Sequence, residues 1–179
     1  MPMSHLKKLG AMVVFLSGLQ GGAAQAQTSP PELSLGFSSY HLRPTRGVDQ
    51  RLDGFNLGGR YGLSSTWSLE AALNRQTGTE AGAVNLRQTG VVAGPRRSWI
   101  WNRYWQGFAH VLAGYEHLSA WEGSASDTKD SLALVAGIGA DYALNSHVSF
   151  RVEEDYSQTH YAGLPQRSTC FNLGIVLRK

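Results

Sequence analysis

Apolar side chains alternate with small or polar ones along most of this chain. In the last stretch, residues 169–178, one parity reads Thr, Phe, Leu, Ile, Leu and the other Cys, Asn, Gly, Val, Arg. Because successive side chains of a strand point to opposite faces, such a stretch forms a ribbon with one apolar face. The pattern recurs about eight times and predicts strands near residues 32–41, 53–62, 67–76, 84–96, 104–118, 130–142, 147–157 and 169–178.

The connections between these stretches alternate between long and short. The short segments are 63–66, 98–103 and 143–146, and the longer, more polar ones are 42–52, 77–83, 119–129 and about 158–168. An up-and-down barrel with both chain ends in the periplasm has this order, because its periplasmic turns are short and its extracellular loops are long. We therefore predict an all-β fold, an eight-stranded antiparallel up-and-down transmembrane β-barrel.

The N-terminal segment has the organisation of a cleavable signal peptide. Lys7 and Lys8 precede a short apolar run at 9–19, and Ala24 and Ala26 place small residues where a signal peptidase reads them. The apolar run is well short of the roughly 20 residues that a membrane-spanning helix requires. We predict a signal peptide at 1–26, cleaved after Ala26, and an outer-membrane β-barrel domain at 27–179.

Composition favours a membrane barrel over a soluble lipocalin-like barrel or a β-sandwich. Charged residues make up 16% of the chain, whereas soluble domains average about 25%. Removal of the signal peptide lowers the formal net charge from +3 to +1, so the basic pI is no argument for a nucleic acid partner. Aromatic residues form two predicted interfacial belts, Tyr61, Trp67, Trp99, Trp101, Tyr104, Trp105 and Tyr142 beside the short turns, and Tyr40, Tyr115, Trp121, Tyr156 and Tyr161 toward the long loops.

Charges of both signs fall on the parity that is predicted to face the lumen. The interior of an eight-stranded barrel is only wide enough for side chains, and buried charges must be paired because an isolated one is costly. We predict an internal ion-pair network, with a gated narrow pore or a small-ligand site as the alternatives. The residues concerned are Arg60, Glu70, Arg87, His110, Glu116, Asp141, Arg151, Glu153 and Asp155.

The alternation is ambiguous at one place, and at another it includes the single cysteine. Between Gly90 and Pro95 both Val91 and Val92 qualify as lipid-facing, so the facing of this strand stays open and a β-bulge is an option. The single cysteine, Cys170, excludes an internal disulfide framework. Its position on the less apolar parity predicts a small packed residue.

Four segments, residues 55–61, 94–96, 107–114 and 173–178, resemble the small outer-membrane β-barrel domain family of Gram-negative bacteria. The likeness extends over nearly the whole chain after the signal peptide. It implies the barrel fold and the outer membrane, but no shared catalytic residues and no common ligand. Barrels of this family usually end in an aromatic residue that the assembly machinery recognises, whereas this sequence ends with Leu177, Arg178 and Lys179.

One pair of residues offers an enzymatic alternative. His117 and Ser119, two residues apart on one strand face, are similar to the His and Ser of outer-membrane lipid A deacylases. A serine nucleophile needs a base within hydrogen-bond reach and an acid that orients the base. Glu122, Asp127 and Asp130 are the candidate acids, but the sequence gives none of them an obvious position on the neighbouring strand, and no Asn-rich oxyanion segment follows.

The sequence therefore predicts a non-enzymatic outer-membrane protein with a structural or surface-interaction role and with its loops outside the cell. A deacylase-like enzyme that uses His117 and Ser119, or a narrow gated channel, are the alternatives. The histidines at 41, 110, 117, 147 and 160 lack a metal-ligand spacing, so we assign no metal, no cofactor and no catalytic residue. The expected partners are outer-membrane lipid, lipopolysaccharide and the assembly machinery, and we expect a monomer.

Overall fold

A computed structural model describes residues 30–44, 50–80, 84–122, 125–161 and 164–179. The predicted signal peptide and its cleavage site lie outside these residues. Within them no helix is long and apolar enough to cross a membrane. The strands are β1 (Glu32–Pro44), β2 (Gln50–Gly62), β3 (Trp67–Glu80), β4 (Val84–Ile100), β5 (Trp105–Glu122), β6 (Ala125–Ala143), β7 (Val148–Tyr161) and β8 (Leu164–Arg178).

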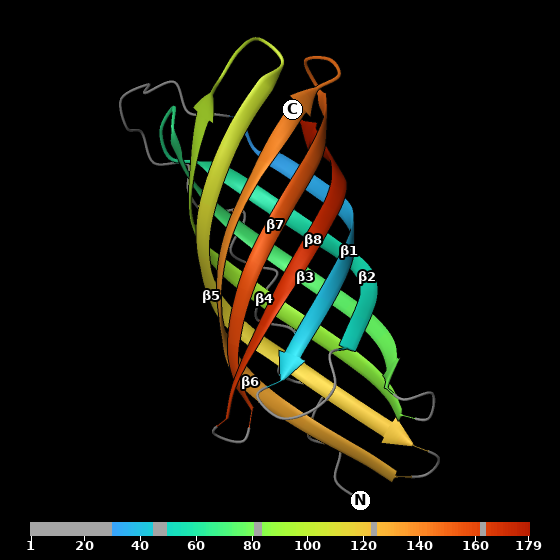
Figure 1. Cartoon of the computed structure of the whole chain (residues 1–179). Coiled ribbons are helices and arrows are strands. Elements are labelled where there is room, and N and C mark those ends of the chain that lie inside the picture. The colour runs from blue at the N-terminus through green and yellow to red at the C-terminus, as the bar shows by residue number, and fades with distance from the viewer. Residues whose placement is uncertain (1–29, 45–49, 81–83, 123–124, 162–163) are drawn as a thin grey trace, which may run out of the picture.

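Each strand pairs antiparallel with the next one in the chain, and β1 also pairs with β8, which closes the sheet. Figure 1 shows the resulting tilted barrel, with the short turns and the C-terminus at its upper end. The β5–β6 hairpin extends at the opposite end, at the lower right of the view. The prediction of an eight-stranded antiparallel barrel is confirmed.

The strands are longer than the alternation predicted. The segment 119–129, predicted as a long connection, is largely strand, because β5 continues to Glu122 and β6 begins at Ala125. Likewise β1 continues to Pro44 and β2 begins at Gln50. The boundary predictions fail because backbone ladder bonds need no apolar side chain, so pairing continues past the point where the apolar face ends.

Strand β4 contains no bulge in its described pairing. Its partners on β5 keep one register on both sides of Gly94 and Pro95, and its ladder with β3 is unbroken. Val92 is buried and faces the lumen, whereas Val91 lies on the outer parity. The suggested bulge was wrong, and the open question about the facing of this strand is settled by the register.

The three short turns share one construction. Leu63, Trp101 and Leu144 begin them, and the amide of each donates to a carbonyl four residues later. The next residue is Ser64, Asn102 or Asn145, and its side-chain oxygen accepts bonds from the amide of the last turn residue and from the first amide of the following strand. These local side-chain caps explain why four residues suffice at this end of the barrel.

The outer face is apolar and carries the predicted belt beside the short turns. All seven aromatic residues of that belt are exposed. In the second belt Tyr115 and Tyr156 are exposed as predicted, but Tyr40 is only 3% exposed and lies in the lumen, because the outward parity of β1 passes through Phe37. The side chain of Tyr161 lies outside the described set. The apolar exterior and polar interior match a barrel that faces lipid.

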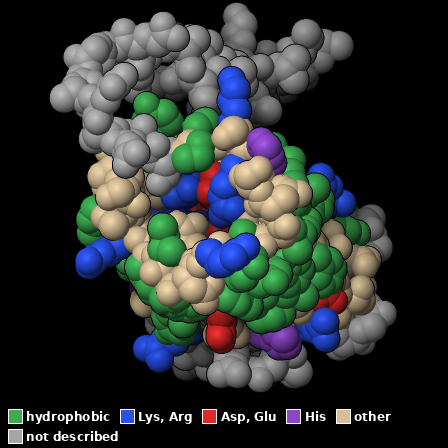
Figure 2. Space-filling model, turned by 90° about the horizontal axis from the view of Figure 1, so that it is seen from above, with side chains coloured by type: hydrophobic (Ala, Val, Ile, Leu, Met, Phe, Trp, Pro, Cys, Tyr) green, Lys and Arg blue, Asp and Glu red, His purple; other side chains and the backbone are tan. Residues whose placement is uncertain are grey.

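The interior is filled by polar and charged side chains. Seen from the end that carries the short turns, Lys and Arg side chains lie beside Asp and Glu at the centre of the molecule, inside a ring of other side chains (Figure 2). The largest fully buried side chain is that of Arg96. Since such groups are costly to bury alone, the contacts among them determine what the interior can do.

Candidate functional site

The lumen near the short turns is organised around Asp141. Its carboxylate accepts bonds of 2.7 and 2.9 Å from Arg151 and a third, of 3.2 Å, from Arg96. Both guanidinium groups lie over the ring of Phe108, at 3.5 Å (Arg96) and 4.8 Å (Arg151) from its centroid. The ring faces both cations, so cation–π contact adds to the ion pairs. This cluster ties β4, β5, β6 and β7 together across the interior.

A second carboxylate, Glu32, joins the first strand to the last. It accepts a 2.6 Å bond from Arg178 on β8 and is paired with Arg60 on β2, whose Nε is 2.8 Å from Oε2. Glu70 on β3 connects this group to the Asp141 cluster, since it lies 3.6 Å from Arg151 and 3.5 Å from Arg96. One continuous ion-pair network therefore spans the closure of the barrel.

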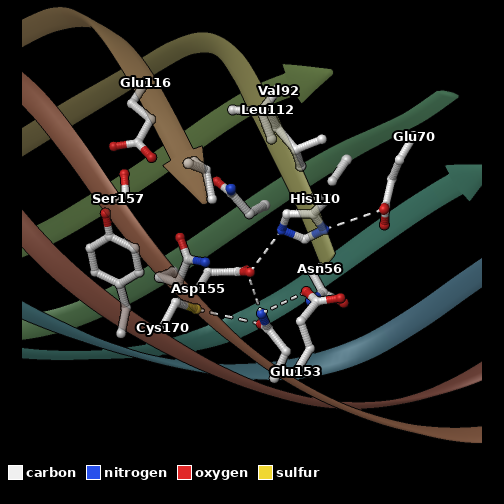
Figure 3. A pocket seen from close by; sticks show the side chains of 16 residues that line it. Asn56, Glu70, Val92, His110, Leu112, Glu116, Glu153, Asp155, Ser157 and Cys170 are labelled. Carbon is white, nitrogen blue, oxygen red and sulfur yellow. Dashed lines mark hydrogen bonds and ion pairs between the residues drawn. The ribbon is translucent and has the colours of Figure 1, made fainter. Parts of the chain in front are cut away.

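His110 occupies the middle of the lumen between two carboxylates. Its Nε2 is 3.0 Å from Asp155, and its Nδ1 is 3.3 Å from Glu70 without hydrogen-bond geometry. Figure 3 shows the His110 ring between Asp155 and Glu70. Asn172 donates to Asp155 and to Glu153. This arrangement requires Gly137 on β6, the strand between β5 and β7, because a Cβ there would lie 2.3 Å from His110 Nε2 and 2.0 Å from Asp155 Oδ1.

Three of these groups are close enough to share a cation. One ligand atom each from Glu70, His110 and Glu153 lies within 4.8 Å of the others. Sequence reasoning missed this grouping because the residues belong to β3, β5 and β7 and have no local spacing. Glu70 is already paired with two arginines, and Glu153 accepts a hydrogen bond from the Asn172 amide, so protein groups already contact both carboxylates in the described structure.

The lumen toward the long hairpins contains an apolar cluster. Tyr40, Leu52, Leu86 and Cys170 form one buried cluster. Cys170 is a small packed residue, as predicted, and its Sγ donates to Asn172 Oδ1 at 3.4 Å. The lumen also contains cavities of about 40 and 20 Å³, both lined in part by Glu70 and Glu153, each with room for a few water molecules at most.

The predicted lumen charges are largely confirmed. Of the predicted set only Arg87 points the other way and is exposed, because the register of β4 puts odd-numbered residues outside. Three lumen charges were missed, Glu32, Arg96 and Arg178. Arg96 follows Pro95 in the stretch whose facing the sequence left open.

A different arrangement lies on the outer face of β5 and β6. Ser119 Oγ is 3.1 Å from His117 Nε2, and His117 Nδ1 is 2.6 Å from Asp130 Oδ1. In the tautomer that carries its proton on Nδ1, His117 donates to Asp130 and accepts from the Ser119 hydroxyl. The order serine, histidine, aspartate is that of a serine hydrolase triad.

The position of the acid corrects the sequence analysis. Asp130 is the direct cross-strand partner of His117 in the β5–β6 ladder, so one of the three candidates does have a place on the neighbouring strand. Asp127 is instead paired with Lys129 at 3.3 Å. The side chain of Glu122 lies outside the described set.

The three residues lie just beyond the apolar band. Tyr115 and Leu132 are cross-strand partners and are 66% and 64% exposed, and they form the last pair of large apolar residues across β5 and β6 at this end, with Trp121 further out on the same face of β5. His117 and Asp130 follow them directly on the same face. A barrel that spans the membrane through its apolar band therefore holds this triad at the outer interface.

A cation accompanies the triad on the neighbouring strand. Arg87 on β4 is the direct partner of Ser119, and its guanidinium carbon lies 5.0 Å from the ring centroid of Trp121. Directly paired residues of adjacent strands have Cβ atoms about 5 Å apart. The misassigned lumen residue Arg87 thus lies beside the serine on the outside of the barrel.

The interior network and the outward apolar face define a transmembrane β-barrel of the outer-membrane class. A family model described as the outer membrane protein beta-barrel domain matches residues 11–178, and the chain belongs to this family. It is an outer-membrane protein of the Gram-negative type. Among curated proteins none matches it.

Solved structures show the same fold. Neisserial surface protein A has a TM-score of 0.74 at 11% identity, with 83% of this chain and 97% of that chain covered. Ail, the attachment invasion locus protein of Yersinia pestis, has a TM-score of 0.63 at 17% identity over 85% and 99%. OprG from Pseudomonas aeruginosa has a TM-score of 0.55 at 12% identity over 85% and 97%.

Proposed function

We propose that the barrel is a closed support with a structural or surface-interaction role, and that its lumen neither conducts nor catalyses. The observation that carries this proposal is the network around Asp141 and Glu32, to which all eight strands contribute a side chain. Opposite charges at these distances fill the space through which an ion would have to pass. The apolar cluster around Leu52 then closes the lumen toward the hairpins.

The long hairpins are the parts of the barrel available to partners. β5 and β6 continue well past Tyr115 and Leu132, so polar strand surface extends beyond the apolar band. A structure of Ail holds the heparin analogue sucrose octasulfate, which supports an interaction role for barrels of this shape. For this chain we propose lipid and lipopolysaccharide as neighbours, insertion by the assembly machinery, and a monomer, because the ion pairs close the barrel within one chain.

Electrical recording of the refolded protein in planar bilayers tests this proposal. The wild type should show no steady conductance, since its lumen is occupied by paired side chains. Arg96→Met removes the most buried cation from the lumen, so the conductance of this variant should be equal to or greater than that of the wild type. A stable ionic current through the wild type that changes its ion selectivity in Arg96→Met would support the narrow-channel alternative instead.

A further inference from the structure

We propose that Ser119, His117 and Asp130 form an ester-hydrolase site on the outside of the barrel, and that its substrate is an acyl ester of an anionic lipid at the outer membrane interface. The proposal for the barrel concerns the lumen and the hairpins. This inference concerns the outer face of β5 and β6, and either can fail without the other.

The first support is the continuity of the hydrogen bonds. The chain from Ser119 through His117 to Asp130 has heavy-atom distances of 3.1 and 2.6 Å, both within the range expected between a nucleophile, its base and the orienting acid. His117 and Ser119 share one face of β5, and Asp130 is fixed opposite His117 by the ladder. Rigid strands, rather than a loop, therefore hold all three groups.

The second support is the depth at which the site lies. The triad begins one step outside the Tyr115 and Leu132 pair, where the hydrocarbon region gives way to the interface. Ester bonds that join acyl chains to lipid headgroups lie in this layer. Since the three side chains point away from the lumen, a lipid beside the barrel can reach Ser119 without leaving the membrane.

The third support is the charge beside the serine. Arg87 is the direct neighbour of Ser119 on β4, and Arg75 is the partner of Thr89, which itself lies opposite His117. Both arginines are exposed. Guanidinium groups bind phosphate oxygens well, which favours a phosphorylated lipid. Arg87 is also the cation best placed to neutralise an oxyanion that develops next to Ser119.

The reaction follows from these positions. Ser119 Oγ attacks the ester carbonyl carbon while its proton passes to His117 Nε2, and the C–O bond breaks as the leaving alcohol takes that proton. Water then attacks the acyl-serine, gives its proton to His117, and releases the fatty acid, which restores the Ser119 hydroxyl. Asp130 holds the histidine and stabilises its protonated form.

The test measures fatty acid release by the refolded barrel in mixed micelles. One arm contains lipopolysaccharide and the other phosphatidylglycerol, so the arms distinguish the two sources of an anionic acyl ester. Wild type should release fatty acid in at least one arm, and Ser119→Ala should lose roughly 10³-fold or more of the rate. Ser126→Ala, a serine on the outer face of β6 opposite Trp121, is the matched control and should keep the wild-type rate.

A second measurement needs no variant. A fluorophosphonate should form an O–P bond with Ser119 Oγ as fluoride leaves and His117 takes the proton, and peptide mass spectrometry should place the label on residue 119. Heat-modifiable gel mobility confirms that each variant is folded. Absence of release in both arms together with an unlabelled Ser119, or release that persists in Ser119→Ala, would overturn the proposal.

Discussion

Two histidines of β5 show how the same kind of contact has different consequences on the two faces of a barrel. His110 lies in the lumen between Asp155 and Glu70, and its side chain is 1% exposed. His117 lies on the outside beside Asp130 and Ser119, and its side chain is 48% exposed. Both rings contact carboxylates, but only the outer ring is accessible to a lipid. The surroundings, rather than the contacts alone, separate a structural histidine from a candidate catalytic one.

The largest expected effect comes from breaking the inner network at Arg151. Arg151→Met removes one of the two strongest partners of the Asp141 carboxylate. Loss of one partner of a buried pair costs about 3 to 5 kcal/mol. The free energy of unfolding in urea, measured on the refolded protein, should fall by that amount. Arg51→Met is the control, because the Arg51–Asp53 pair is 61% and 45% exposed and should contribute only about 0 to 1 kcal/mol. Equal losses for the two variants would show that Arg151 is solvated.

A somewhat smaller effect should follow from a charge on the lipid face. Leu173 is exposed on the apolar band of β8, and an arginine near the bilayer midplane costs about 2 to 4 kcal/mol. Leu173→Arg should therefore make folding into liposomes less favourable by that amount. Thr169→Arg lies on the same face of β8 beyond Phe171 and should cost about 0 to 1 kcal/mol, as expected near the interface. A larger loss for Thr169→Arg than for Leu173→Arg would show that Thr169, and not Leu173, lies nearer the bilayer midplane.

The smallest effects should separate the two histidines themselves. His110→Asn deprives the buried carboxylates of Asp155 and Glu70 of a partner and should destabilise the barrel by about 1 to 3 kcal/mol. His117→Asn breaks an exposed contact and should cost no more than about 1 kcal/mol. Thermal unfolding followed by gel mobility measures both. A His117 variant as unstable as the His110 variant would mean that the outer contact is a structural requirement.

The alternation of side chains predicted which way most of the strands face. Leu33, Leu35 and Phe37 point outward as expected, because burial by lipid acts on every second residue. The alternation did not show which of the adjacent residues Val91 and Val92 faces outward. For this reason Arg87, on the same strand, was wrongly assigned to the lumen. Periodicity also predicted strands that end too early at the hairpins, because the polar parts of the hairpins pair through the backbone alone.

The triad could be predicted only in part. His117 and Ser119 share a face of one strand, which spacing alone reveals, but the partner of His117 depends on the register of the β5–β6 hairpin. A shift of one residue would turn Asp130 to the other face. The sequence contains no local signal for that register, so the acid had three candidates. The ion pairs of the lumen were likewise predictable as a set but not as partners, because Arg96, Asp141 and Glu70 come from three different strands.

Chemical modification of histidine tests the division between the two faces most directly. The folded barrel in detergent is treated with diethyl pyrocarbonate, and peptide mass spectrometry gives the rate of modification at each histidine. His117 should react while His110 stays protected, and His110 should react only after unfolding in urea. Modification of His110 in the folded barrel as fast as that of His117 would show that the lumen is open to solvent, and it would contradict the closed, ion-paired interior.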